Sequence, residues 1–113
     1  MEVRAKTTSL SISPQKLRLV IDLVRGLGAK QAATMLEYMP KKGADMVHKT
    51  LLSAIANAEN NHDLNPDDLY VKTIMADEGP RLKRMKAGAR GRYKPRVRRL
   101  SHLTIILAER EGA

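Results

Sequence analysis

The sequence predicts an α+β fold: three helices packed on a small three-stranded antiparallel sheet with a long protruding β-hairpin. One short segment alternates polar and apolar residues, and three later segments repeat apolar residues at helical spacing. Two segments rich in β-forming residues then flank the run RLKRMKAGARGRYKPRVRR, residues 81–99. A chain of 113 residues has room for one domain of ordinary size.

The first two predicted elements are a short strand and a helix. Alternation over Glu2–Thr7 indicates a strand with one buried face. The helix lies within SPQKLRLVIDLVRG, where Ser13 suits the N-cap, Pro14 the first helical position and Gly26 the stop. Its apolar stripe, at i, i+3, i+4 and i+7, is Leu17, Val20, Ile21 and Val24.

Two more helices are predicted before the second strand. One runs from about Ala29 to Tyr38, and Pro40 ends it or opens the next. Its expected inner residues are Ala32, Met35, Leu36 and Met39. The longest helix runs from about Lys41 to Asn61. Its expected stripe is Val47, Leu51, Ile55 (or Ala54) and Ala58.

Two strands are predicted on either side of the basic run, over Asp68–Ala76 and Leu103–Ala108. Their positions favour one long antiparallel hairpin whose base joins the domain. We therefore expect a single domain over 1–113, with a globular body of residues 1–79 and 101–113 and an extended basic β-hairpin of residues 80–100.

The basic run holds the whole excess of positive charge. The net charge is +9, yet residues 81–99 contain ten Lys or Arg and no Asp or Glu, so the rest of the chain is close to neutral. Alternation places Arg81 and Lys83 on one face of a strand and Arg84 on the other, so neither face can form a core. Ordering each residue costs about 1–2 kcal/mol of backbone entropy, so the hairpin either stays mobile or is ordered by an anionic partner.

RNA is the polyanion that suits this hairpin best. A membrane-binding segment would need an apolar face beside its cations. A DNA-reading helix would need more outward basic residues than Lys16, Arg18 and Arg25. Folded RNA offers phosphates on all sides of a narrow passage, and Gly88 and Gly91 would allow a tight turn. A free-standing regulator that uses the hairpin on DNA or messenger RNA is the alternative.

Catalysis, a metal and a cofactor are not expected. The chain has no Cys, its three His (His48, His62, His102) lack ligand spacing, and no GK[ST] phosphate loop is present. Ser101 and His102 are adjacent, so on a strand they point to opposite faces. The acidic pairs Asp67–Asp68 and Asp77–Glu78 lie at strand boundaries. No long apolar run or secretory signal is seen, so we expect the protein to act where it is made.

The candidate RNA-binding residues are cations. The predicted set is Arg81, Lys83, Arg84, Lys86, Arg90, Arg92, Lys94, Arg96, Arg98 and Arg99 in the hairpin, with Lys16, Arg18 and Arg25 in the body. Lys6, Lys41, Lys42 and Lys49 either share an RNA-facing side or are solvated.

The chain resembles the family of large-subunit ribosomal protein twenty-two, in its bacterial or organellar form. The strings that carry the resemblance are ISPQKLRLVIDLVRG, SAIANAENNHD, DEGPRLKR, ARGR and SHLTIIL, in this order. The resemblance implies a structural constituent of the large ribosomal subunit that binds 23S-type rRNA and supports subunit assembly. It implies a globular part near the peptide exit and a hairpin that lines the nascent-polypeptide tunnel.

The resemblance also assigns roles and partners. It puts the hairpin base at Asp77–Pro80 and the return to the body at Ser101 and His102. Its tunnel-facing tip is Ala87, Gly88, Ala89, Arg90, Gly91 and Arg92. Many bacterial members have Pro-Arg where this chain has Ala87 and Gly88, so the tip lacks one cation and one conformational restraint. Asn57 and Asn60 are further rRNA candidates. The implied partners are rRNA, neighbouring ribosomal proteins and the nascent polypeptide, in the bacterial cytoplasm or an organelle, without a membrane or a homo-oligomer.

Overall fold

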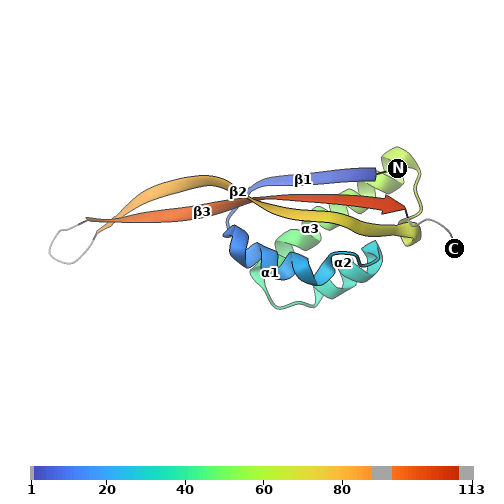
Figure 1. The fold of residues 1–113 in the computed structure, drawn as a ribbon, viewed down its shortest axis with the longest axis horizontal. Coiled ribbons are helices and arrows are strands. Elements are labelled where there is room, and N and C mark those ends of the chain that lie inside the picture. The colour runs from blue at the N-terminus through green and yellow to red at the C-terminus, as the bar shows by residue number, and fades with distance from the viewer. Residues whose placement is uncertain (1, 88–92, 110–113) are drawn as a thin grey trace.

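The computed structural model describes the backbone of residues 2–87 and 93–109 and the side chains of residues 2–80 and 99–109. Its elements are β1 (Glu2–Leu10), α1 (Pro14–Val24), α2 (Ala29–Glu37), α3 (Lys42–His62), the 3₁₀ helix η1 (Pro66–Asp68), β2 (Leu69–Ala87) and β3 (Tyr93–Glu109). Three α-helices lie on one face of the three-stranded sheet, and the β2–β3 hairpin extends beyond them (Figure 1). The predicted α+β fold is confirmed.

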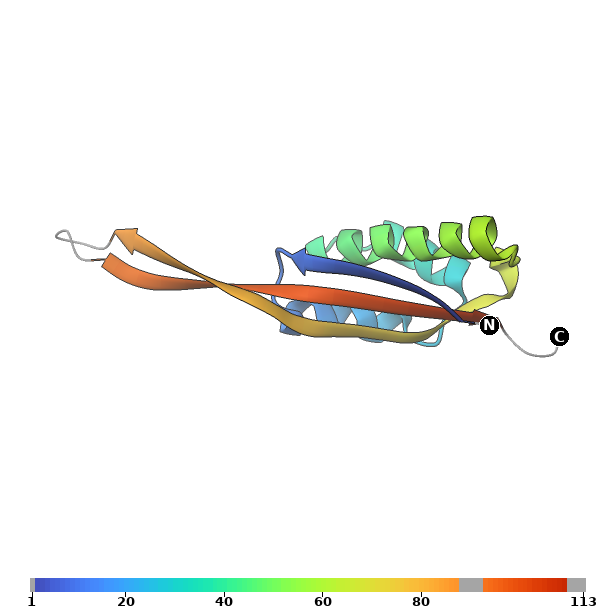
Figure 2. The same ribbon diagram turned by 90° about the horizontal axis from the view of Figure 1, so that it is seen from above.

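Strand β3 is the centre of the sheet. The strand order is β1-β3-β2, and both neighbours run antiparallel to β3. The β2–β3 ladder begins at Leu69 opposite Glu109 and continues to Ala87 opposite Tyr93. Because only its first part is covered by helices, the second part leaves the body as a twisted ribbon (Figure 2). The molecule is therefore elongated, with principal extents of 67 × 25 × 18 Å.

The core lies between the sheet and the helices. Leu17 and Ile21 of α1 and Leu51 of α3 are fully buried, as are Ile105 and Leu107 of β3. The start of α1 follows from its cap, because the Ser13 hydroxyl accepts a hydrogen bond from the Lys16 backbone N–H at 3.4 Å. The helical stripes predicted from spacing thus form one continuous apolar layer against the sheet.

Three irregularities interrupt the pairing of the strands. In β2, Lys72 is an extra residue between two paired positions. The side chains that face the core are therefore Leu69 and Val71 before it, and Ile74 and Ala76 after it. In β1 the register shifts between Thr7 and Leu10. The third shift lies at Gly79 and Pro80, where the hairpin leaves the body. Bulges increase the local twist, and the two-stranded ribbon is twisted where it extends beyond the helices (Figure 2).

Some sequence-based expectations need correction. Strand β1 continues three residues past the predicted end, because Ser9 adopts a left-handed φ of 55° and its N–H donates to His102 Nδ1 at 3.0 Å. Met35 is 39% exposed rather than an inner residue of α2. In α3, Ala54 is buried and Ile55 only partly so.

Replacing Gly79 with Ala is expected to destabilise the protein. A Cβ at this position would lie 3.1 Å from the Leu100 carbonyl oxygen and 3.2 Å from its carbonyl carbon. The central strand cannot move away easily, so we expect Gly79→Ala to lower the free energy of unfolding by about 1–3 kcal/mol, as overpacking does elsewhere. Urea unfolding would measure the change.

The matched control is Gly43→Ala. Its Cβ would also meet close neighbours, but these are the side-chain ends of Ile12 and Val20, each at 3.2 Å. Side-chain ends can shift, and Ala gains up to about 1 kcal/mol of helix propensity over Gly, so this variant should lose less stability. Equal stability of Gly79→Ala and the wild type would contradict the close approach at the bulge.

Candidate nucleic-acid interface

The register of the hairpin places like charges opposite each other. Beyond the bulge at Gly79 and Pro80, Arg81 pairs with Arg99, Arg84 with Arg96 and Lys86 with Lys94. Like charges directly across an antiparallel pair destabilise it. The hairpin ladder is therefore electrostatically unfavourable unless anions lie beside it.

The other predicted hairpin cations occupy the same two strands. Lys83 pairs with Val97, and Arg98 pairs with Leu82. Of the predicted tip, Ala87 is the last residue of β2, paired with Tyr93. The remaining tip residues, Gly88, Ala89, Arg90, Gly91 and Arg92, lie outside the described residues.

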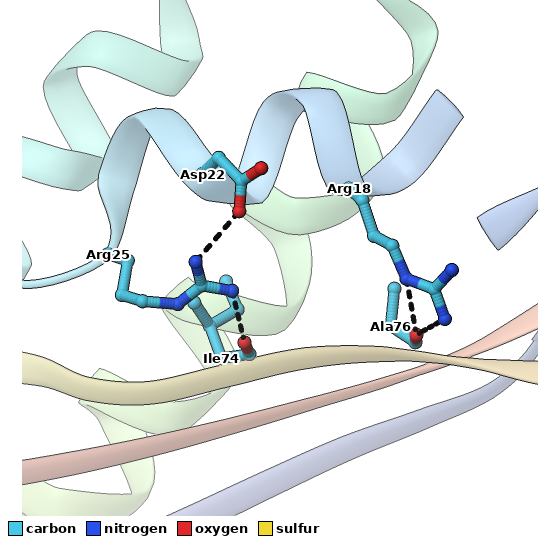
Figure 3. Close-up of polar contacts among 5 residues, drawn as sticks. All are labelled: Arg18, Asp22, Arg25, Ile74 and Ala76. Carbon is cyan, nitrogen blue, oxygen red and sulfur yellow. Dashed lines mark hydrogen bonds and ion pairs between the residues drawn. The ribbon is translucent and has the colours of Figure 1, made fainter. Parts of the chain in front are cut away.

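Arg18 of α1 and Arg25, the residue that follows α1, bind the backbone of the sheet. Arg18 donates from Nε and Nη2 to the Ala76 carbonyl oxygen, at 3.2 and 2.8 Å. Arg25 donates from Nη2 to the Ile74 carbonyl oxygen at 3.1 Å and from Nη1 to Asp22 at 2.7 Å (Figure 3). Both carbonyls belong to β2, an edge strand of the sheet. These two arginines therefore cover backbone carbonyls on the open edge of β2.

The loop between α1 and α2 covers the same edge further along. The Gly26 N–H donates to the Val71 carbonyl at 3.0 Å, and the Val71 N–H donates to the Leu27 carbonyl at 2.9 Å. Together with the arginines, this loop satisfies outward backbone groups of β2 from Val71 to Ala76. Spacing alone could not reveal this role, because the acceptors are backbone carbonyls about fifty residues away in the chain.

Several body cations are neutralised by neighbouring carboxylates. Lys30 pairs with Asp67 at 2.6 Å, and this hydrogen bond and charge raise the pKa of Lys30. Lys72 pairs with Glu2; the hydrogen bond raises the pKa of Lys72 and lowers that of Glu2. Lys49 lies 3.5 Å from Asp45. These lysines offer less free charge to a polyanion than their number suggests.

Two predicted cations of the body–hairpin junction lie together. Lys16 of α1 and Arg99 of β3 are exposed and line one groove, which Lys42 of α3 also lines. Within the part of the chain whose side chains are described, none of the three forms an ion pair. Lys6 and Lys41 are exposed elsewhere, and Asn57 accepts a hydrogen bond from Asn61.

Ser101 and His102 have separate structural partners. The buried Ser101 hydroxyl donates to the Ile12 carbonyl at 2.6 Å, whereas His102 accepts from the Ser9 N–H. Among residues 2–80 and 99–109, whose side chains the structure describes, no three His, Cys, Asp or Glu side chains gather as a metal site would require. None of the described helices has the length and apolar character needed to cross a membrane.

A compact α+β body that carries an unfavourably basic hairpin defines a class: small proteins that bind a polyanion with an extended arm. Comparison with known proteins narrows the class. The family model described as Ribosomal protein L22p/L17e matches residues 5–108, and the chain belongs to this family.

Its relatives cover nearly the whole chain. Large ribosomal subunit protein uL22 of Thermomicrobium roseum is 52% identical over 96% of this chain and 92% of its own length. The protein of the same name from Thermus thermophilus is 50% identical over 99% of both chains. That from Chloroflexus aggregans is 49% identical over 97% of both.

The double variant Arg18→Lys with Arg25→Lys tests the edge contacts. Lysine keeps the charge but cannot donate from two nitrogens of one planar group. We expect the free energy of unfolding to fall by about 1–2 kcal/mol, the sum of two modest hydrogen-bond contributions. Urea unfolding measures this fall. Unchanged stability would show that the contacts to Ala76 and Ile74 contribute nothing to the fold.

Proposed function

We propose that this protein is a structural constituent of the large ribosomal subunit. In this proposal it binds 23S-type rRNA and supports subunit assembly, with its body near the peptide exit and its hairpin along the nascent-polypeptide tunnel. The observation that carries the proposal is the pairing of Arg81 with Arg99, Arg84 with Arg96 and Lys86 with Lys94. Phosphates on both sides of the ribbon would neutralise this repulsion, and folded rRNA supplies them.

The body–hairpin division gives each part a task. The body, residues 1–79 and 101–113, has its own core and positions the hairpin of residues 80–100. We assign rRNA contacts to Lys16 and to ten cations of the hairpin. These ten are Arg81, Lys83, Arg84, Lys86, Arg90, Arg92, Lys94, Arg96, Arg98 and Arg99. Arg18 and Arg25 keep an rRNA role only through N–H groups that their contacts to β2 leave free.

The proposed positions of the body near the peptide exit and of the hairpin along the tunnel define the remaining partners. Neighbouring ribosomal proteins would contact the body, and the nascent polypeptide would pass residues 87–92. The protein would act in the bacterial cytoplasm as one copy within each ribosome, without catalysis of its own. The names and organisms of the relatives support this assignment over a free-standing DNA or messenger RNA regulator.

Sedimentation of a lysate in high magnesium tests the proposal. We expect the protein to co-migrate with large subunits in a one-to-one ratio and to leave them as salt rises, because phosphate contacts weaken with salt. Quantitative mass spectrometry of gradient fractions gives the ratio. Recovery mainly in the ribosome-free fractions would overturn the proposal and favour the regulator.

A further inference from the structure

The junction between the body and the hairpin holds a groove of about 420 Å³ lined by cations from three elements. Lys16 comes from α1, Lys42 from α3 and Arg99 from β3, and Ser11, Ile12 and Ser13 complete the lining. None of the described residues that line it carries a carboxylate. Three segments far apart in the chain thus bring positive charge and two hydroxyl groups to one concave surface.

The cations of this groove are not neutralised within the described structure. The described ion pairs join Arg25, Lys30, Lys49 and Lys72 to acidic residues, and none includes a groove cation. Lys42 Nζ donates to the Ser11 carbonyl at 3.0 Å, which holds the ammonium at the groove. A lysine ammonium has three N–H donors, so two are left for a ligand.

The positions of the two lysines oppose ordinary helix electrostatics. Lys16 lies in the first turn of α1, which has no acidic residue, and Lys42 is the first residue of α3. The first turn of a helix carries partial positive charge and favours anions. Asp45, the acidic residue in the first turn of α3, pairs with Lys49 instead. An anion in the groove would offset the repulsion between these lysines and the positive ends of the two helices.

The shape of the surface favours a chain over a small ion. A second groove, of about 410 Å³, shares Ser13 and Arg99 with the first and continues past Gln15 and Arg18 to Glu78. Glu78 places a carboxylate in the second groove, so a phosphate would be held in the first. A polyanion could place one phosphate in the first groove and continue along the base of the hairpin.

We propose that Lys16, Lys42 and Arg99, with Ser11 and Ser13, form a binding site for a backbone phosphate of RNA. This inference rests on the proposed function and adds a specific site to it. The site would fix the angle at which RNA meets the body where the hairpin emerges. It also gives Lys42 an RNA contact that its sequence position alone left open.

The test compares two double variants of the full chain that lose equal charge. Lys16→Gln with Lys42→Gln removes two groove cations, and Lys30→Gln with Lys72→Gln removes two ion-paired lysines outside it. Filter binding to the large-subunit rRNA of Thermus thermophilus is measured across a range of salt concentrations. Thermal unfolding checks that both variants fold; the groove variant should be at least as stable as the wild type, because cations leave two helix N-termini.

We expect the groove variant to bind roughly tenfold more weakly than the control at about 0.1 M salt, with a log–log salt slope smaller by about 1.4–1.8. Equal affinities and slopes for the two variants would overturn the site while the wild type still bound rRNA. Failure of the wild type to bind rRNA would instead overturn the proposed function, and the RNA site with it.

A second measurement separates an RNA phosphate from a free anion. Inorganic phosphate is titrated into the full chain at constant ionic strength, and the amide NMR signals of Ser13 and Lys16 are followed. We expect no saturation, since one phosphate gains little from an open groove. Saturation with a Kd of about 1 mM or tighter would assign the site to a small anion and overturn its assignment to RNA.

Discussion

The antiparallel ladder between β2 and β3 connects every other part of this structure. It starts at Leu69 and Glu109 inside the body and ends at Ala87 and Tyr93, far beyond the helices. The same backbone hydrogen bonds thus pass through two environments. In the body, buried side chains such as Ile74 and Ile105 stabilise the ladder. Beyond the bulge at Gly79 and Pro80, the paired positions are largely basic, and stabilisation has to come from outside the chain.

The body is built so that this ladder leaves it in a defined direction. Arg18 and Arg25 hold the outer edge of β2 to α1, and the Ser9 bulge binds His102 on β3. Gly79 allows β2 to approach Leu100 closely where the ribbon begins. These contacts constrain β2 and β3 from Ile74 to the start of the ribbon, so they fix the path of the ribbon from there. The groove of Lys16, Lys42 and Arg99 lies at the same junction, where RNA along the hairpin would first meet the body.

Much of the fold could be predicted from the sequence because its signals are local. Capping by Ser13, the spacing of apolar residues and the position of the basic run gave three helices and a hairpin close to those observed. Contacts between residues far apart in the chain could not be predicted from the sequence. The register shift of β1 at Ser9 depends on a hydrogen bond to His102. The change at Lys72 in which β2 side chains face the core depends on pairing with β3.

The candidate site was predictable to a similar degree. The basic run and the two β-rich segments that flank it identified the hairpin, but the opposed cations emerge only from the register of β2 and β3. Arg18 and Arg25 were predicted to bind RNA, since no sequence pattern marks backbone carbonyls as acceptors. Lys42 was ambiguous as one lysine among several; the fold places it beside Lys16 and Arg99.

In the proposed function, the hairpin's opposed cations weaken the free protein and strengthen its complex with RNA. The double variant Arg84→Gln with Arg96→Gln removes one such pair, and two quantities are measured on it: urea unfolding of the free protein and affinity for large-subunit rRNA. We expect opposite changes: the free protein is as stable as the wild type or gains up to about 1 kcal/mol, whereas rRNA binding weakens roughly tenfold at about 0.1 M salt. A less stable free protein with unchanged rRNA affinity would contradict it.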